Sequence, residues 1–168
     1  MRNPCKNETM KRIQIFILVA FLLNLLFIWG NSLLDGTQSK QVSDAVSGVV
    51  EKVIAAITEK PPQDLLPSED LLSKIVRKVA HAVEFCCLGI WSALLFLPNN
   101  LTGNGCKTVC LIGLFVPLMD ETIQLLTNRS SAVTDIWIDI AGYAVGSTVT
   151  ALLLFWHAKK KHSIIHKG

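Results

Sequence analysis

Four long apolar segments set the pattern of this chain. They cover about residues 13–29, 79–97, 108–126 and 136–156. A helix needs about 20 mostly apolar residues to cross the hydrocarbon of a bilayer, so each segment is long enough to span a membrane. The second and third segments also carry ionisable side chains, which cost about 2.5 to 3.5 kcal/mol each at the bilayer centre. The pattern predicts an all-α integral membrane protein with four transmembrane helices.

A different pattern occupies the loop of residues 30–78, between the first two predicted spans. From Val42 to Ile57, apolar residues recur at the i, i+3, i+4, i+7 spacing of an amphipathic helix, and Pro61-Pro62 ends the run. Such a helix can lie in the headgroup plane or pack on the mouth of the bundle. Its polar face is not rich in lysine, which favours packing on the bundle. Further on, Ser68 suits the N-cap of a helix that continues into the second span.

Composition supports a membrane protein and excludes several other classes. Hydrophobic residues make up 51% of the 168-residue chain and charged residues 17%, against about 25% charged in typical soluble proteins. These values argue against a disordered chain, a disulfide-rich secreted scaffold and a nucleic-acid-binding protein. None of the five cysteines falls in the loop 30–78. The length indicates a single membrane domain over residues 1–168.

Basic residues beside the spans predict the orientation. Arg2, Lys6, Lys11 and Arg12 precede the first span, and Lys159, Lys160, Lys161 and Lys167 follow the fourth. Because lysine and arginine near span ends favour the cytoplasm, both termini are expected there, and the loop with the amphipathic helix is expected outside. The first span could instead be a signal peptide. Its apolar stretch exceeds the usual 7 to 15 residues and no A-x-A cleavage site follows, which favours an uncleaved anchor.

Ionisable residues from three spans fall at one depth in this topology, towards the outer surface. Residues three or four apart share a helix face, so each span can aim a polar row into the bundle. Candidates for a catalytic role are His81, Glu84, Asp120, Glu121, Asp135 and Asp139, and candidates for ligand binding are Arg77, Lys78, Gln124 and Arg129. Intramembrane charges of this kind are expensive and usually functional.

Some of these residues also have simpler interpretations. Asp135 can be an acid that favours a helix N-terminus, and Arg129 a charge that reaches the membrane surface. The pair His81 and Glu84 can be a structural hydrogen-bonded lock. Gly142 and Gly146 form a G-x-x-x-G, which we expect to be a helix-packing contact within the bundle rather than a dimerisation site.

The same residues carry a family resemblance. The segment from Arg77 to Phe85 resembles the signature R-K-x-A-H-x-x-E-[YF] of the VanZ-like family of bacterial membrane proteins. The series Asp120, Glu121, Gln124, Arg129, Asp135, Gly142 and Gly146 resembles its second signature, and the segment from Trp29 to Ser32 is similar to its serine-rich segment. One departure is Asp139, where members often carry asparagine. The resemblance implies a multi-pass protein of the bacterial plasma membrane, and the family's founding member is linked to resistance to the glycopeptide teicoplanin.

Three functions are compatible with such a site. It can bind or modify a lipid-linked cell-envelope component, with the basic residues at its rim holding an anionic headgroup. It can belong to a small cation- or proton-coupled transporter, although the cytoplasmic halves of the spans carry few ionisable residues. It can also be a structural cluster that holds the helices together. The carboxylates can act as general acid and base or hold a divalent cation. No sequence motif indicates which type of reaction the protein would catalyse.

Overall fold

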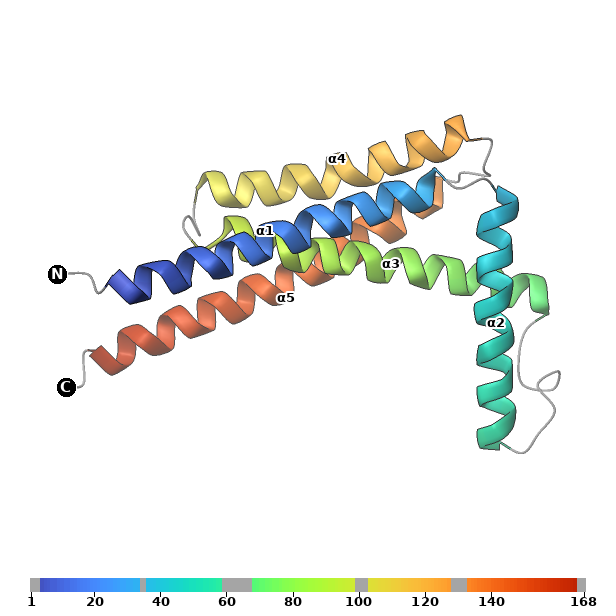
Figure 1. Cartoon of the computed structure of the whole chain (residues 1–168), viewed down its shortest axis with the longest axis horizontal. Helices are drawn as coiled ribbons and strands as arrows, with labels where there is room; N and C mark the ends of the chain where they lie inside the picture. The colour runs from blue at the N-terminus through green and yellow to red at the C-terminus, as the bar shows by residue number, and fades with distance from the viewer. Residues whose placement is uncertain (1–3, 34–35, 59–67, 99–102, 128–132, 166–168) are drawn as a thin grey trace.

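The chain folds into an entirely helical bundle in the part that the structure describes. The computed structural model describes residues 4–33, 36–58, 68–98, 103–127 and 133–165. The helices are α1 (Pro4–Ser32), α2 (Gly36–Thr58), α3 (Glu69–Phe96), α4 (Asn104–Leu126) and α5 (Val133–Ile165). Figure 1 shows α1, α3, α4 and α5 running lengthwise as a bundle, while α2 crosses one end of it. The start of α1 and the end of α5 lie together at the opposite end.

The four lengthwise helices are long and apolar enough to cross a membrane, which confirms the four predicted spans. Each helix begins before its predicted apolar segment, because the polar residues that precede the segment are also helical. Many large side chains on the outside of the bundle are apolar and exposed, such as Phe16, Leu26, Leu111 and Phe155. Exposure of this kind is unfavourable in water and suits contact with lipid tails. The protein is therefore a multi-pass membrane protein.

The start of α3 is as the sequence predicts. Ser68 occupies the N-cap, and its backbone carbonyl accepts hydrogen bonds from the N–H groups of Leu71 and Leu72, both at 2.9 Å. The Ser68 hydroxyl makes no capping bond. From Glu69, one continuous helix leads into the membrane span.

The amphipathic helix predicted near residues 42–57 is present as α2, and it packs on the bundle, as predicted from its polar face. It contacts α3, and among its described side chains Ser43 and Ser47 are buried. The apolar residues Val46, Val49, Val53 and Ile57 are exposed. The helix thus meets the bundle with small polar residues, which allow close approach, and leaves an apolar stripe uncovered.

The contact between α3 and α5 is the most extensive in the molecule and depends on glycine. A Cβ atom on Gly142 would collide with the backbone carbonyl of Ala82, and one on Gly146 with that of Cys86. From the other side, a Cβ on Gly89 would collide with the carbonyl of Tyr143. The G-x-x-x-G therefore packs within the bundle, as expected, because only glycine lets the two backbones approach so closely.

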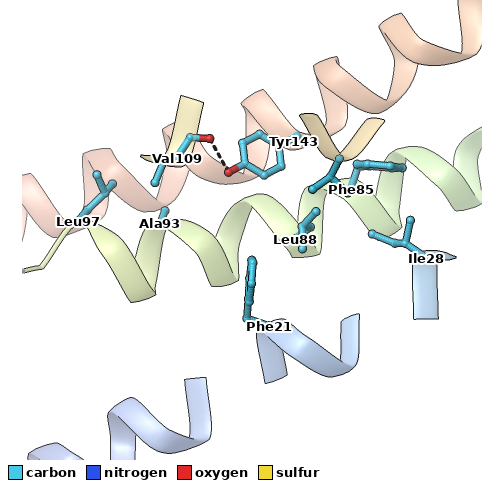
Figure 2. Close-up of a cluster of buried hydrophobic side chains, with 9 residues drawn as sticks. Phe21, Ile28, Phe85, Leu88, Ala93, Leu97, Val109 and Tyr143 are labelled. Atoms are coloured by element: carbon cyan, nitrogen blue, oxygen red, sulfur yellow. Dashed lines mark hydrogen bonds between the residues drawn. The ribbon is translucent and has the colours of Figure 1, made fainter. Parts of the chain in front are cut away.

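An apolar core fills the middle of the bundle (Figure 2). Side chains from all four lengthwise helices meet there, among them Phe21, Leu88 and Val109. The buried Tyr143 places its ring in this core, and its hydroxyl donates to the Val109 carbonyl at 2.8 Å. The same hydroxyl lies 2.6 Å from the Ser92 hydroxyl, which can donate to it. The core thus joins α3, α4 and α5 through a buried phenol whose hydrogen bonds are satisfied.

Candidate functional site

Buried and half-buried polar residues gather where α1 and α4 end and α5 begins, beside the middle of α3 and towards the end of the bundle that α2 crosses (Figure 1). We call this group the polar cluster. Its members are Asn31 and Ser32 on α1, His81 and Glu84 on α3, Asp120, Glu121 and Gln124 on α4, and Asp139 on α5. Four helices thus contribute polar side chains to one end of the bundle.

Asp120 on α4 forms a hydrogen bond that connects this helix to α1. Its side chain is fully buried, one turn after the buried Pro117 inside α4. One carboxylate oxygen accepts a hydrogen bond from the Ser32 hydroxyl, and the other accepts one from the Gln124 side-chain amide at 2.8 Å. Gln124 stands four residues after Asp120, so the helix itself places the amide over the carboxylate.

The end of α1 has a second link to the cluster. The Asn31 amide donates to a carboxylate oxygen of Glu84 on α3 at 3.0 Å. The Thr127 hydroxyl, just after α4, lies 3.3 Å from the Ser32 carbonyl. Sequence analysis assigned no site role to Asn31 and Ser32. Their position at the end of the first span, level with the other polar residues, could have indicated one.

Two other carboxylates are buried but lack matching hydrogen bonds. Glu121 is 4% exposed, and neither of its carboxylate oxygens has a hydrogen-bond partner among the residues that the structure describes. Asp139 is 1% exposed, and its Oδ1 atom likewise has no partner within the described ranges. Buried polar groups are normally satisfied, since each unmade bond costs about 1 to 3 kcal/mol, more for a charged group. These two acids are therefore not explained by helix packing alone.

Three members of the cluster come close enough to share a ligand. His81, Asp120 and Asp139 each offer one nitrogen or oxygen atom, and these three atoms lie within 4.8 Å of one another. They come from α3, α4 and α5, which are far apart in sequence. The fold, and not local spacing, creates this group.

A small pocket adjoins the cluster. It is lined by Arg77, Lys78, His81, Gln124, Asp135, Ile138 and Asp139. The space inside, about 10 Å³, is close to what one water molecule occupies. At its rim, the Lys78 ammonium forms an ion pair with Asp135 at 2.9 Å. The pocket can admit a single ion or one small group, while a larger molecule would have to rest at its mouth.

The predicted site residues are thus largely brought together. Arg77, Lys78, His81, Gln124, Asp135 and Asp139 line the pocket, and Asp120 joins it through Gln124. Glu84 and Glu121 are in the cluster but do not line the pocket. Asp135 lies in the first turn of α5, as its simpler interpretation required, and also pairs with Lys78. Arg129 falls outside the described residues.

Comparison with known proteins gives one match. The model of the VanZ/LLP1 family matches residues 14–155, which is most of the chain and includes the whole polar cluster. No curated protein and no solved structure matches the chain.

Proposed function

The chain belongs to the VanZ/LLP1 family of membrane proteins, and on that premise we propose that its polar cluster and pocket bind the anionic headgroup of a lipid-linked cell-envelope component. The site would open to the extracytoplasmic side of the bacterial plasma membrane, with both termini in the cytoplasm. The lipid tail would stay in the bilayer beside the bundle. Such binding would offer one route to the teicoplanin resistance that is linked to the family's founding member.

The observation that carries this proposal is the burial of carboxylates without partners beside a pocket with a basic rim. Arg77 and Lys78 line the pocket, so a phosphate at its mouth would meet the Arg77 guanidinium and would share the Lys78 ammonium with Asp135. Guanidinium groups bind phosphate through paired, charge-assisted hydrogen bonds. The position near one end of the spans suits a headgroup, because that is where headgroups lie relative to a transmembrane bundle.

Coupled transport is the weaker candidate. A transported ion would need polar groups along the whole bundle, but the middle is closed by the apolar core. Ser92 and Tyr143 are buried there and are bonded to each other, and neither is charged at neutral pH. A purely structural role of the cluster predicts a different result: substitutions in it would lower stability without a separate effect on ligand binding.

Binding can be tested with a polyprenyl phosphate and the purified protein in detergent, read by native mass spectrometry. We expect tighter binding of polyprenyl phosphate than of the uncharged polyprenol. Arg77→Gln should weaken binding about tenfold, as expected for loss of one charge-assisted bond. Arg12→Gln is the matched control, since Arg12 is exposed on α1 near the other end of the bundle. Equal binding of polyprenol and polyprenyl phosphate would contradict the proposal.

The orientation can be tested separately with reporter fusions. Fusions after Trp29 and near Asn128 should report the outside, and fusions near Asn100 and after Lys161 should report the cytoplasm. This follows from the basic residues that flank the first and fourth spans. An inside signal from a fusion near Gln63 would show that the cluster faces the cytoplasm and would overturn the proposed location.

A further inference from the structure

Three ligand atoms of the kinds that bind metal ions meet inside the polar cluster. One comes from the imidazole of His81 and one from each carboxylate of Asp120 and Asp139, all within 4.8 Å of one another. Metal bonds to such atoms are about 2.0 to 2.2 Å long, so two ligands on opposite sides of one ion stand about 4 Å apart. Small side-chain rotations would bring all three atoms onto a single ion.

The burial of Asp139 is an independent observation that favours a bound cation. The side chain is 1% exposed, and Oδ1 has no hydrogen-bond partner in the part of the chain that the structure describes. Asp139 also borders the small pocket, together with His81. The pocket is about the size of one water molecule, so its interior suits an ion or an ion-bound water, while a headgroup would be held at its mouth.

The charges around His81, Asp120 and Asp139 also favour a bound cation. Asp120 is fully buried, and Glu121, beside it in sequence, is 4% exposed. Lys78, a cation at the pocket, is already paired with Asp135. Several buried carboxylates in one membrane-embedded cluster repel one another and resist the loss of water, unless a cation offsets their charge.

We propose that His81, Asp120 and Asp139 bind one divalent transition-metal ion, such as Mn²⁺ or Zn²⁺. A mixed set of one imidazole nitrogen and two carboxylate oxygens suits these ions better than Mg²⁺ or Ca²⁺, which prefer oxygen ligands alone. The pocket leaves room for a further ligand on the ion, where a phosphate oxygen at the mouth could bind. The binding of a phosphate oxygen to the ion rests on the proposed function. The binding of the ion by His81, Asp120 and Asp139 does not.

The test uses the full-length protein in detergent, stripped with a chelator and then titrated with Mn²⁺, Zn²⁺ or Mg²⁺ in the absence of lipid. Bound metal is counted by elemental analysis after desalting, and the melting temperature is recorded in parallel. We expect about one equivalent of Mn²⁺ or Zn²⁺ per chain and a rise in melting temperature on binding. His81→Gln and Asp139→Asn should weaken binding at least tenfold.

The variant Asp44→Asn is the matched control. It removes the same charge, but Asp44 is exposed on α2 and lies outside both the pocket and the three-residue group, so metal binding should be kept. Without metal, Asp139→Asn should melt at or above the wild-type temperature, which shows that it folds. The inference fails if the wild type retains no Mn²⁺ or Zn²⁺, if Mg²⁺ binds equally well, or if Asp139→Asn binds like the wild type. Lipid binding without metal binding would overturn this inference alone, and the reverse would overturn the proposed function alone.

Discussion

Tyr143 and Asp139 stand one turn apart on α5 and are both buried, yet their surroundings differ. In the middle of the bundle, the Tyr143 hydroxyl is bonded to the Val109 carbonyl and to Ser92. Towards the end that α2 crosses, Asp139 Oδ1 and both oxygens of Glu121 have no hydrogen-bond partner among the described residues. In the middle of the bundle, polar groups form hydrogen bonds between helices. Towards the end that α2 crosses, buried acidic side chains have oxygens that helix packing leaves without hydrogen bonds. Residues of the second kind are retained for function more often than for stability.

The largest effect on stability is expected in the middle, at the glycine contact. Gly146→Ala should lower the free energy of unfolding by about 3 kcal/mol, the upper end of the range for overpacking, since the new Cβ would collide with the Cys86 carbonyl. Gly30→Ala is the control, because nothing lies within 4 Å of a Cβ there. Denaturation in mixed detergent micelles measures both. Equal stability of the two variants would contradict the close α3–α5 packing.

A smaller loss is expected at Asp120, and it depends on the replacement. Asp120→Ala removes the acceptor for Ser32 and Gln124 and should cost about 2 kcal/mol. Asp120→Asn should cost little. Its oxygen can still accept from Gln124, and its amide can donate to Ser32, whose hydroxyl already lies 3.1 Å from the Ile28 carbonyl. If both variants lose the same stability in the denaturation assay, the hydrogen bonds of Asp120 are not as described.

Removing the central phenol hydroxyl should cost about 1 kcal/mol. Tyr143→Phe leaves the Val109 carbonyl unbonded, and hydrogen bonds between membrane helices contribute about 0.6 kcal/mol on average and about 1.7 at most. Thr122→Val is the control, because the Thr122 hydroxyl bonds only to the Leu118 carbonyl of its own helix and is exposed. Melting curves of the two variants should differ, with Tyr143→Phe lower. A Tyr143→Phe protein as stable as the wild type would disprove the structural role of the phenol.

The smallest effect is expected at the pocket rim. Lys78→Gln breaks the ion pair with Asp135, in which the two side chains are 40% and 21% exposed. Pairs exposed to this degree contribute about 0 to 1 kcal/mol, so we expect a loss below about 0.5 kcal/mol. Because Lys78 lines the pocket, the affinity for polyprenyl phosphate should fall, and by more in free energy than the stability against denaturation. A loss of stability as large as that of Asp120→Ala would instead assign Lys78 to the structural part of the bundle.

The sequence predicts much of this arrangement because helical periodicity and membrane depth are local properties. They indicate the four spans, the helix from Ser68, the glycine contact, and the meeting of His81, Asp120 and Asp139 at one depth. The cross-helix partners need the fold itself. Asn31 bonds to Glu84 across 53 positions, and Ser32 to Asp120 across 88.

Two features also follow from packing rather than from periodicity. The side on which α2 packs depends on close approach of backbones, which favours Ser43 and Ser47 over its valines. Tyr143 continues the helical row of Asp135 and Asp139 yet belongs to the core. One turn of a helix is enough to move a residue from the site into the apolar layer, and spacing alone does not locate that boundary.

The most direct test of the central claim compares Glu121→Gln with Tyr143→Phe in two assays, melting temperature and polyprenyl phosphate binding. In the part of the chain that the structure describes, Glu121 is a buried acid without a hydrogen-bond partner, so Glu121→Gln should leave the melting temperature unchanged or raise it. Because a carboxylate in the cluster repels a phosphate at the pocket mouth, the same variant should bind polyprenyl phosphate more tightly than the wild type. Tyr143→Phe should show the opposite, with a lower melting temperature and binding like the wild type. If Glu121→Gln instead melts at a lower temperature and binds like the wild type, the polar cluster is a structural element and not a binding site.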